Sequence, residues 1–159
     1  MTAAAHTGRR LLAAGALAAA LATGAAGCGA SSQESNAYVD RVNIAQTRFA
    51  SSFARLSREI TTASSRARDR RTLRSIAAAT DSTTADLRRI KPPESVKVQH
   101  RDLLDAISSY GDAIALAERG LSGGVKEAAD AEARLAAETA RTGARITNAI
   151  TAINQKLRN

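Results

Sequence analysis

The sequence contains very few aromatic, cysteine, proline and histidine residues. Its 159 residues include no tryptophan, two phenylalanines, two tyrosines, one cysteine, two prolines and two histidines. A single cysteine cannot form an internal disulfide, so no such cross-link supports the fold. The shortage of proline and aromatics, beside abundant alanine, arginine and leucine, favours helices over strands. A chain of this length is expected to form one domain.

Residues suited to catalysis or metal binding are equally scarce. The chain has no Gly-x-Ser-x-Gly, Cys-x-x-Cys-His or Glu-x-x-His motif, and a metal site needs several ligands. His100 and Glu132 occupy apolar stripes of different predicted helices, but at opposite ends of an antiparallel bundle. We therefore expect no enzyme activity, no metal and no cofactor. His100 is expected to be structural, with Thr83 or Thr84 as its hydrogen-bond partner.

The N-terminal segment has the order of a secretory signal. Arg9 and Arg10 precede an uncharged run over residues 11–26, which is short for a permanent membrane span. Small residues then lead to the only cysteine, Cys28. Residues 1–27 are therefore predicted to be a cleaved signal peptide. The paired arginines leave both the general and the twin-arginine export routes open.

The Ala25-Ala26-Gly27-Cys28 tetrapeptide resembles a bacterial lipobox. The resemblance implies a diacylglyceryl group on the Cys28 sulfur and cleavage between Gly27 and Cys28. Two acyl chains give stable membrane attachment, whereas one chain gives only marginal binding. With its alanine and arginine bias, the chain resembles small helical lipoproteins of actinobacteria. That resemblance implies a lipid-anchored protein on the extracytoplasmic face of the cell membrane.

After the lipobox, residues 28–35 are predicted to be the lipidated cysteine and a flexible tether. Residues 36–159 repeat apolar side chains at spacings of three and four, the pattern of amphipathic helices. The predicted helices span residues 36–67, 70–91, 94–120 and 125–157. Because their connections are short, we expect an all-α, antiparallel, up-down-up-down four-helix bundle. The alternative is two long hairpins that complete a bundle only as a dimer.

Specific residues mark the predicted helix boundaries. Asp69 is a plausible N-cap of the second helix, Pro92 and Pro93 separate the second helix from the third, and glycines at 120, 123 and 124 end the third. The predicted seams contain many alanines and threonines, so helices are expected to approach closely. If Phe53 is central, its replacement by alanine would cost about 3–5 kcal/mol.

Positive charge is concentrated in the first predicted hairpin. Residues 36–91 hold 12 basic and 5 acidic side chains, whereas residues 92–159 hold 9 of each. One cluster lies around the first turn, at Arg66, Arg68, Arg70, Arg71 and Arg74. A second flanks the prolines, at Arg88, Arg89, Lys91 and Lys97. Anchoring at Cys28 would place the first cluster at the tip far from the membrane and turn the second toward the lipid.

The predicted function is a non-enzymatic interaction or scaffold module of the cell envelope. Its expected partners are an acidic envelope component at the first cluster or anionic lipid head groups at the second. Nucleic acid is not expected, because aromatics for base stacking are lacking and the chain is predicted to be exported. The alternative function is a small-ligand or metal carrier with a pocket inside the bundle near Ala45, Thr80, Thr139 and Thr142.

Overall fold

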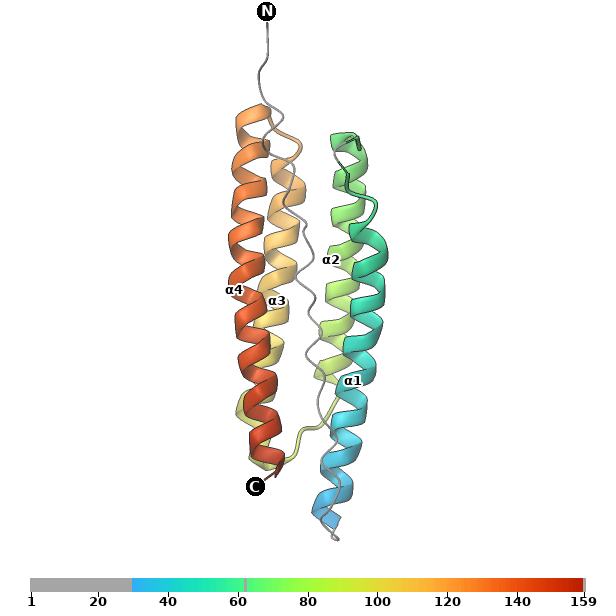
Figure 1. The fold of residues 1–159 in the computed structure, drawn as a ribbon, viewed down its shortest axis with the longest axis vertical. Helices are drawn as coiled ribbons and strands as arrows, with labels where there is room; N and C mark the ends of the chain where they lie inside the picture. Colours follow the sequence, from blue (N-terminus) through green and yellow to red (C-terminus); the bar gives the residue numbers. More distant parts are fainter. Residues whose placement is uncertain (1–29, 62, 159) are drawn as a thin grey trace, which may run out of the picture.

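A computed structural model of the chain describes residues 30–61 and 63–158. In these residues the chain forms four α-helices and one short 3-10 helix. They are α1 (Ala30–Ser57), α2 (Arg66–Arg88), η1 (Glu94–Val96), α3 (Lys97–Gly120) and α4 (Val125–Arg158). Successive helices run in opposite directions, which confirms the predicted all-α four-helix bundle (Figure 1). Because α2 packs along α3, the two hairpins join within a single chain.

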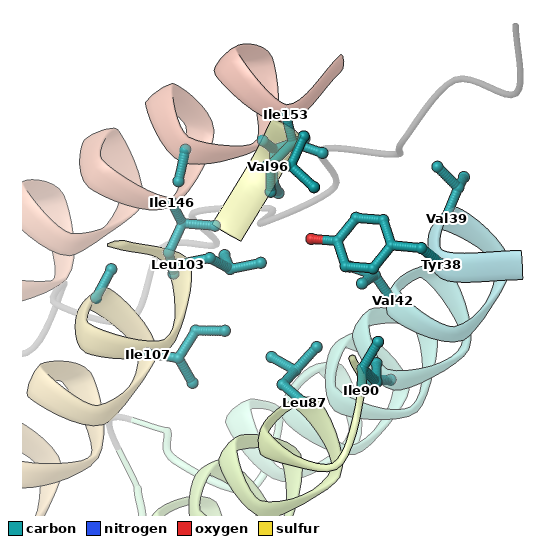
Figure 2. Packing of buried hydrophobic residues seen from close by; sticks show 14 residues of the cluster. Tyr38, Val39, Val42, Leu87, Ile90, Val96, Leu103, Ile107, Ile146 and Ile153 are labelled. Atoms are coloured by element: carbon teal, nitrogen blue, oxygen red, sulfur yellow. The ribbon is translucent and has the colours of Figure 1, made fainter. Parts of the chain in front are cut away.

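The buried apolar side chains form two clusters at opposite ends of the bundle. The end with residues 89–96 and the end of α4 is called the linker end; the end with both hairpin turns is called the hairpin end (Figure 1). The linker-end core includes Tyr38, Val42, Leu103 and Ile153 (Figure 2). The hairpin-end core includes Leu73, Ile76, Tyr110, Ile114 and Leu135. Buried threonines of α2 and α4 lie between them in sequence.

The first helix begins earlier than predicted. Ala30–Ser35 belong to α1, whereas their small polar residues predicted a flexible tether. Ala30, Gln33 and Glu34 are favourable helix residues, and neither glycine nor proline follows Gly29 to interrupt them. The tether prediction is therefore wrong for Ala30–Ser35.

The turn between α1 and α2 also differs from the prediction. The first helix ends at Ser57, ten residues before the predicted end, and α2 starts at Arg66. Local bonds replace helical ones here: the Thr61 amide donates to Ser64 Oγ, and Ser64 Oγ donates back to the Thr61 carbonyl. Serine and threonine side chains compete with the helix ladder in this way.

Ser65, and not Asp69, is the N-cap of α2. Its side chain accepts a hydrogen bond from the Arg68 amide, and its backbone is extended, with φ −80° and ψ 153°. Asp69 is buried one turn into the helix, where its carboxylate accepts from the Ser64 hydroxyl. A carboxylate in the first turn is favourable to the helix dipole.

The other two connections agree closely with the sequence. Pro92 and Pro93 follow α2, and Pro93 has the extended ψ of 150° that ends helical geometry. The third helix begins with η1 and continues regularly from Lys97. It ends at the predicted Gly120, and α4 starts at the predicted Val125.

The side of the bundle between α1 and α4 is less tightly packed than the other three sides. The neighbouring pairs α1–α2, α2–α3 and α3–α4 pack together, whereas α1 and α4 hardly approach each other. Phe49 and Phe53 of α1 are only partly buried against the hairpin-end core. A side chain added at Gly143 of α4 would meet nothing within 4 Å. The expected close approach of the helices therefore does not extend to α1 and α4, and Phe53 is half-buried, so the condition on its predicted cost is not met.

Candidate functional site

The predicted lipidation and cleavage residues, Cys28 and Gly27, lie outside the described residues, as do Arg9 and Arg10. From Ala30 onward, no described helix is both long and apolar enough to cross a bilayer.

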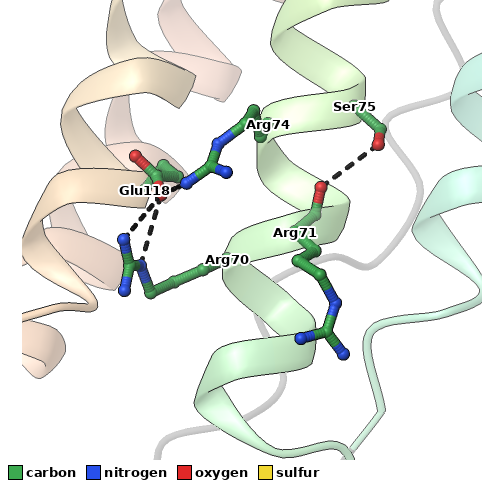
Figure 3. A network of polar contacts seen from close by, with 5 residues as sticks. All are labelled: Arg70, Arg71, Arg74, Ser75 and Glu118. Atoms are coloured by element: carbon green, nitrogen blue, oxygen red, sulfur yellow. Dashed lines mark hydrogen bonds and ion pairs between the residues drawn. The ribbon is translucent and has the colours of Figure 1, made fainter.

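The first arginine cluster divides into two groups. Arg70 and Arg74 of α2 both reach Glu118 of α3, with nitrogen–oxygen distances of 3.0 and 2.7 Å (Figure 3). The Glu118 side chain is only 14% exposed, so this contact fastens α2 to α3 at the hairpin end. The hydrogen bond from Arg74, joined by that from Arg70, lowers the pKa of Glu118. These two arginines therefore have a structural role.

The rest of that cluster remains at the surface. Arg66, Arg68 and Arg71 are exposed, and Arg66 makes only a long contact of 3.5 Å with the Gly123 carbonyl. Arg71 contributes its backbone carbonyl, to which the Ser75 hydroxyl donates (Figure 3). The guanidinium groups of Arg68 and Arg71 thus face solvent on the outer part of α2.

The second cluster, beside the prolines, is partly neutralised by nearby acids. Arg89 pairs with Asp86, and Lys97 pairs with Glu94. Arg48 of α1 also lies 4.0 Å from Asp86. Arg88 and Lys91 are exposed. The cluster is therefore less strongly charged than its sequence suggests.

His100 is buried in the linker-end core, but its partner is not a threonine. The Tyr38 hydroxyl and His100 Nδ1 are hydrogen-bonded at 3.1 Å, joining α1 to α3. Figure 2 shows the Tyr38 hydroxyl pointing away from α1 into the core. Thr83 and Thr84 instead donate to carbonyls four residues earlier in α2. The predicted threonine partner is wrong, and nothing in the sequence spacing pointed to a residue 62 positions away.

Burial governs the ionisation of this pair. Burial lowers the pKa of His100, because the charged imidazolium would lose its water. The nearby Leu87 backbone opposes this effect and raises the pKa. The geometry at Nε2 is too poor for a hydrogen bond. Burial likewise raises the pKa of Tyr38. A neutral imidazole and a neutral phenol are therefore the forms that the core accommodates.

The residues of the predicted interior pocket are packed against their surroundings. Ala45, Thr80 and Thr142 are at most 4% exposed. The Thr80 and Thr139 hydroxyls donate to carbonyls of their own helices, and the Thr142 hydroxyl contacts Glu138. These hydroxyls are satisfied within their helices and do not line an open binding site.

An open groove of about 620 Å³ lies between α3 and α4 on their outer side. Leu116 and Leu135, with several alanines, form its apolar floor, and Leu116 is 61% exposed. Its rim carries more acidic than basic groups: Asp112, Glu127, Asp130, Glu138, Arg134 and Arg141. This groove was not predicted from the sequence. Its signal was Leu116, an apolar residue outside the predicted core stripe.

His100 lies near the start of α3 and Glu132 near the start of α4, at opposite ends of the bundle. Within residues 30–61 and 63–158, no three histidine, cysteine, aspartate or glutamate side chains are grouped as a metal site requires. No protein-family model, curated protein or solved structure matches the chain.

Proposed function

We propose that this chain is a lipid-anchored protein on the extracytoplasmic face of the cell membrane, acting as a non-enzymatic interaction or scaffold module. The order of charged, apolar and small residues before Cys28 supports the anchor. The packed interior supports the interaction role, because Ala45, Thr80 and Thr142 are buried. The Thr80 and Thr139 hydroxyls donate to carbonyls of their own helices. The outer surfaces of the helices are therefore the parts available to a partner.

The start of α1 defines how such an anchor would hold the bundle. The helix begins at Ala30, two residues after Cys28, and its first buried residue in the described part is Tyr38. Eight helical residues rise about 12 Å. If α1 stands upright on the membrane, this height exceeds the Debye length of about 8 Å at physiological ionic strength. An acidic envelope partner is therefore favoured over lipid head groups.

The anchor is tested by replacing Cys28 with serine and fractionating the cells. We expect Cys28→Ser to leave the membrane fraction, or to accumulate uncleaved, because the thiolate is the group that accepts the lipid. Ser35→Ala is the matched control and should remain with the membrane. Normal processing and membrane retention of Cys28→Ser would reject the anchor.

The interaction role is tested by crosslinked pull-down from membranes. The triple variant Arg66→Ser, Arg68→Ser, Arg71→Ser removes exposed arginines at the hairpin end without touching the contacts of Glu118. We expect it to lose a crosslinked partner that the wild type captures. Arg101→Ser, Arg145→Ser, Arg158→Ser removes equal charge from the second hairpin and serves as control. An identical partner profile for wild type and the first variant would refute this use of the tip.

A second candidate function is a small-ligand carrier that uses the outer groove between α3 and α4. Its size is suitable for a small molecule, and its acidic rim suits a ligand with an apolar body and a positive charge. Nile red fluorescence reports apolar binding there. We expect Leu116→Ser to abolish the signal and Val98→Ser, at a residue that is 65% exposed, to preserve it. Equal signals from both variants would exclude the groove.

A further inference from the structure

The outer side of the α1–α2 hairpin carries a continuous row of arginines, which we call the arginine band. On α1 it comprises Arg41, Arg48 and Arg55, and on α2 Arg68, Arg71 and Arg89; all six are exposed. The contact between Arg48 and Asp86 shows that this edge of α1 borders α2. Residues seven positions apart share a helix face, so Arg41 and Arg55 lie on the same edge. The α1 arginines repeat about every 10.5 Å.

On α2 the same edge is fixed by two contacts with α1. The Thr72 hydroxyl donates to Glu59, and Asp86 lies opposite Arg48. Arg68 is one helical turn before Thr72, and Arg89 is three residues after Asp86, so both lie along this edge. The band therefore extends along the hairpin and connects the two clusters that the sequence placed at separate ends.

The acidic side chains of the α1–α2 hairpin neutralise only part of the positive charge of the arginine band. Asp69 is buried and Glu59 is half-buried, each accepting a hydroxyl hydrogen bond. Asp81 faces α3, because its carboxylate lies against Gly111. Asp86 lies within this edge, where it contacts Arg48 and Arg89. Asp40 lines the same surface hollow as Arg48, and Glu34, seven residues before Arg41, lies at the linker end of the edge. Six arginines therefore exceed the three acids along the band.

We propose that the arginine band binds a linear polymer that carries repeated phosphate groups but no nucleobases. The inference rests on the proposed interaction role and specifies its partner. Every cation of the band is an arginine, whose planar guanidinium can bind phosphate through two parallel hydrogen bonds. The Arg48 and Arg89 side chains are 74% and 73% exposed, so their donors are accessible. A row of such groups binds a chain more strongly than one free phosphate, because each contact raises the effective concentration for the next.

The direction and composition of the band favour such a polymer over two other phosphate-bearing partners. The band follows the long axis of the bundle, so a membrane below the linker end would meet only one end of it. Single-stranded nucleic acid binding generally uses exposed aromatic rings. The aromatic residues of α1 and α3 instead belong to the two cores: Tyr38, Phe49, Phe53 and Tyr110.

The binding test uses the full chain with Cys28→Ser and inorganic polyphosphate as the probe. Binding is followed by calorimetry over a range of salt concentrations, and unfolding by circular dichroism. The band variant adds Arg48→Ser, Arg55→Ser and Arg71→Ser. These three substitutions should weaken polyphosphate binding at least tenfold. They should also reduce the slope of log binding constant against log salt concentration by about 2, because each phosphate contact of a single strand contributes about 0.7 to that slope. The control variant Arg101→Ser, Arg145→Ser, Arg158→Ser should bind within threefold of the parent.

Charge-conserving substitutions keep the test informative if the serine variant unfolds. Arg48→Lys, Arg55→Lys, Arg71→Lys retains the charge but removes the planar fork, and should bind polyphosphate about threefold to tenfold more weakly than the parent. Equal losses in the band and control variants would overturn the proposal. So would polyglutamate, orthophosphate at matched ionic strength, single-stranded DNA or anionic vesicles binding as tightly as polyphosphate. Because Cys28 is absent throughout, failure of the lipid anchor would not affect this result.

Discussion

The buried imidazole of His100 couples the stability of the fold to pH. Burial lowers the pKa of His100 in the folded state, whereas the unfolded chain has the ordinary value of about 6.5. As pH falls below this value, the unfolded state binds a proton more readily than the folded state does. Stability is therefore complete above about pH 6.5 and declines below it.

We expect the melting temperature of the protein to fall between pH 7.5 and pH 5.0, and the fall to be smaller in His100→Gln. The chain has only two histidines, which provides a matched control: His6→Gln should retain the full pH dependence. Melting curves by circular dichroism at 0.5 pH intervals test this. A profile in His100→Gln that parallels the wild type would contradict the assignment.

Glu118 introduces a second pH dependence at lower pH. Its folded-state pKa is lowered by the hydrogen bond from Arg74 and then that from Arg70. Its contribution is present above the unfolded pKa and is lost as pH falls through the folded value. We expect Glu118→Gln to lower the free energy of unfolding by about 0.5–1 kcal/mol at pH 7, since its arginine partners are partly exposed. The difference should shrink toward pH 3 in urea titrations.

The control for Glu118 is Glu94, which pairs with Lys97 but is 86% exposed. Exposed pairs of this type contribute little, so Glu94→Gln should change the free energy of unfolding by less than about 0.3 kcal/mol. If the two substitutions have equal effects, the contact in Figure 3 is not a fastening between α2 and α3.

At the scale of the helices, two glycines distinguish a tight seam from an open one. A Cβ at Gly120 would lie 2.3 Å from the Cβ of Ala131, so α3 and α4 must separate to accept it. Gly143 has no neighbour within 4 Å of such a Cβ. Alanine is favoured over glycine inside a helix by up to about 1 kcal/mol.

We therefore expect opposite effects from the same substitution. Gly143→Ala should raise the free energy of unfolding by about 0.5–1 kcal/mol, because it gains helix propensity without a clash. Gly120→Ala should lower it by about 1–3 kcal/mol, in the range typical of overpacking. Urea denaturation of both variants at one pH measures the difference. Stabilisation by both would show that the contact between α3 and α4 is not tight at Gly120.

The helices were predictable where apolar spacing or a breaking residue decides the structure. Gly120 predicted the end of α3, and the two prolines predicted the break between α2 and the third helix; both predictions are confirmed. The end of α1 was not predictable by the same means, because apolar spacing continues to Ile60 while the Ser64 and Ser65 hydroxyls form local bonds. The roles of the candidate site residues could not be predicted from local sequence, because their side chains contact partners that are distant in the chain. Glu118, which binds Arg70 and Arg74, is more than 40 positions from both.

At the scale of the whole molecule, α1 is the least supported helix. It packs along α2 and contributes to both cores, but it hardly approaches α4. Its half near the linker end contains the buried Tyr38, Val42 and Ala45. Its half near the hairpin end relies on the partly buried Phe49 and Phe53. Segments with fewer buried contacts open at lower free energy than the rest of a fold.

Native-state hydrogen exchange should reveal this difference along the chain. We expect amides in residues 46–57 to exchange at least about tenfold faster than those in α3, which corresponds to about 1.4 kcal/mol in opening free energy. Residues 38–45 should be intermediate, because the Tyr38–His100 bond joins that half to α3. Tyr38→Phe should accelerate exchange there and leave α3 unchanged. Equal protection of α1 and α3 would mean that packing on α2 alone holds α1 as firmly as a helix with neighbours on two sides.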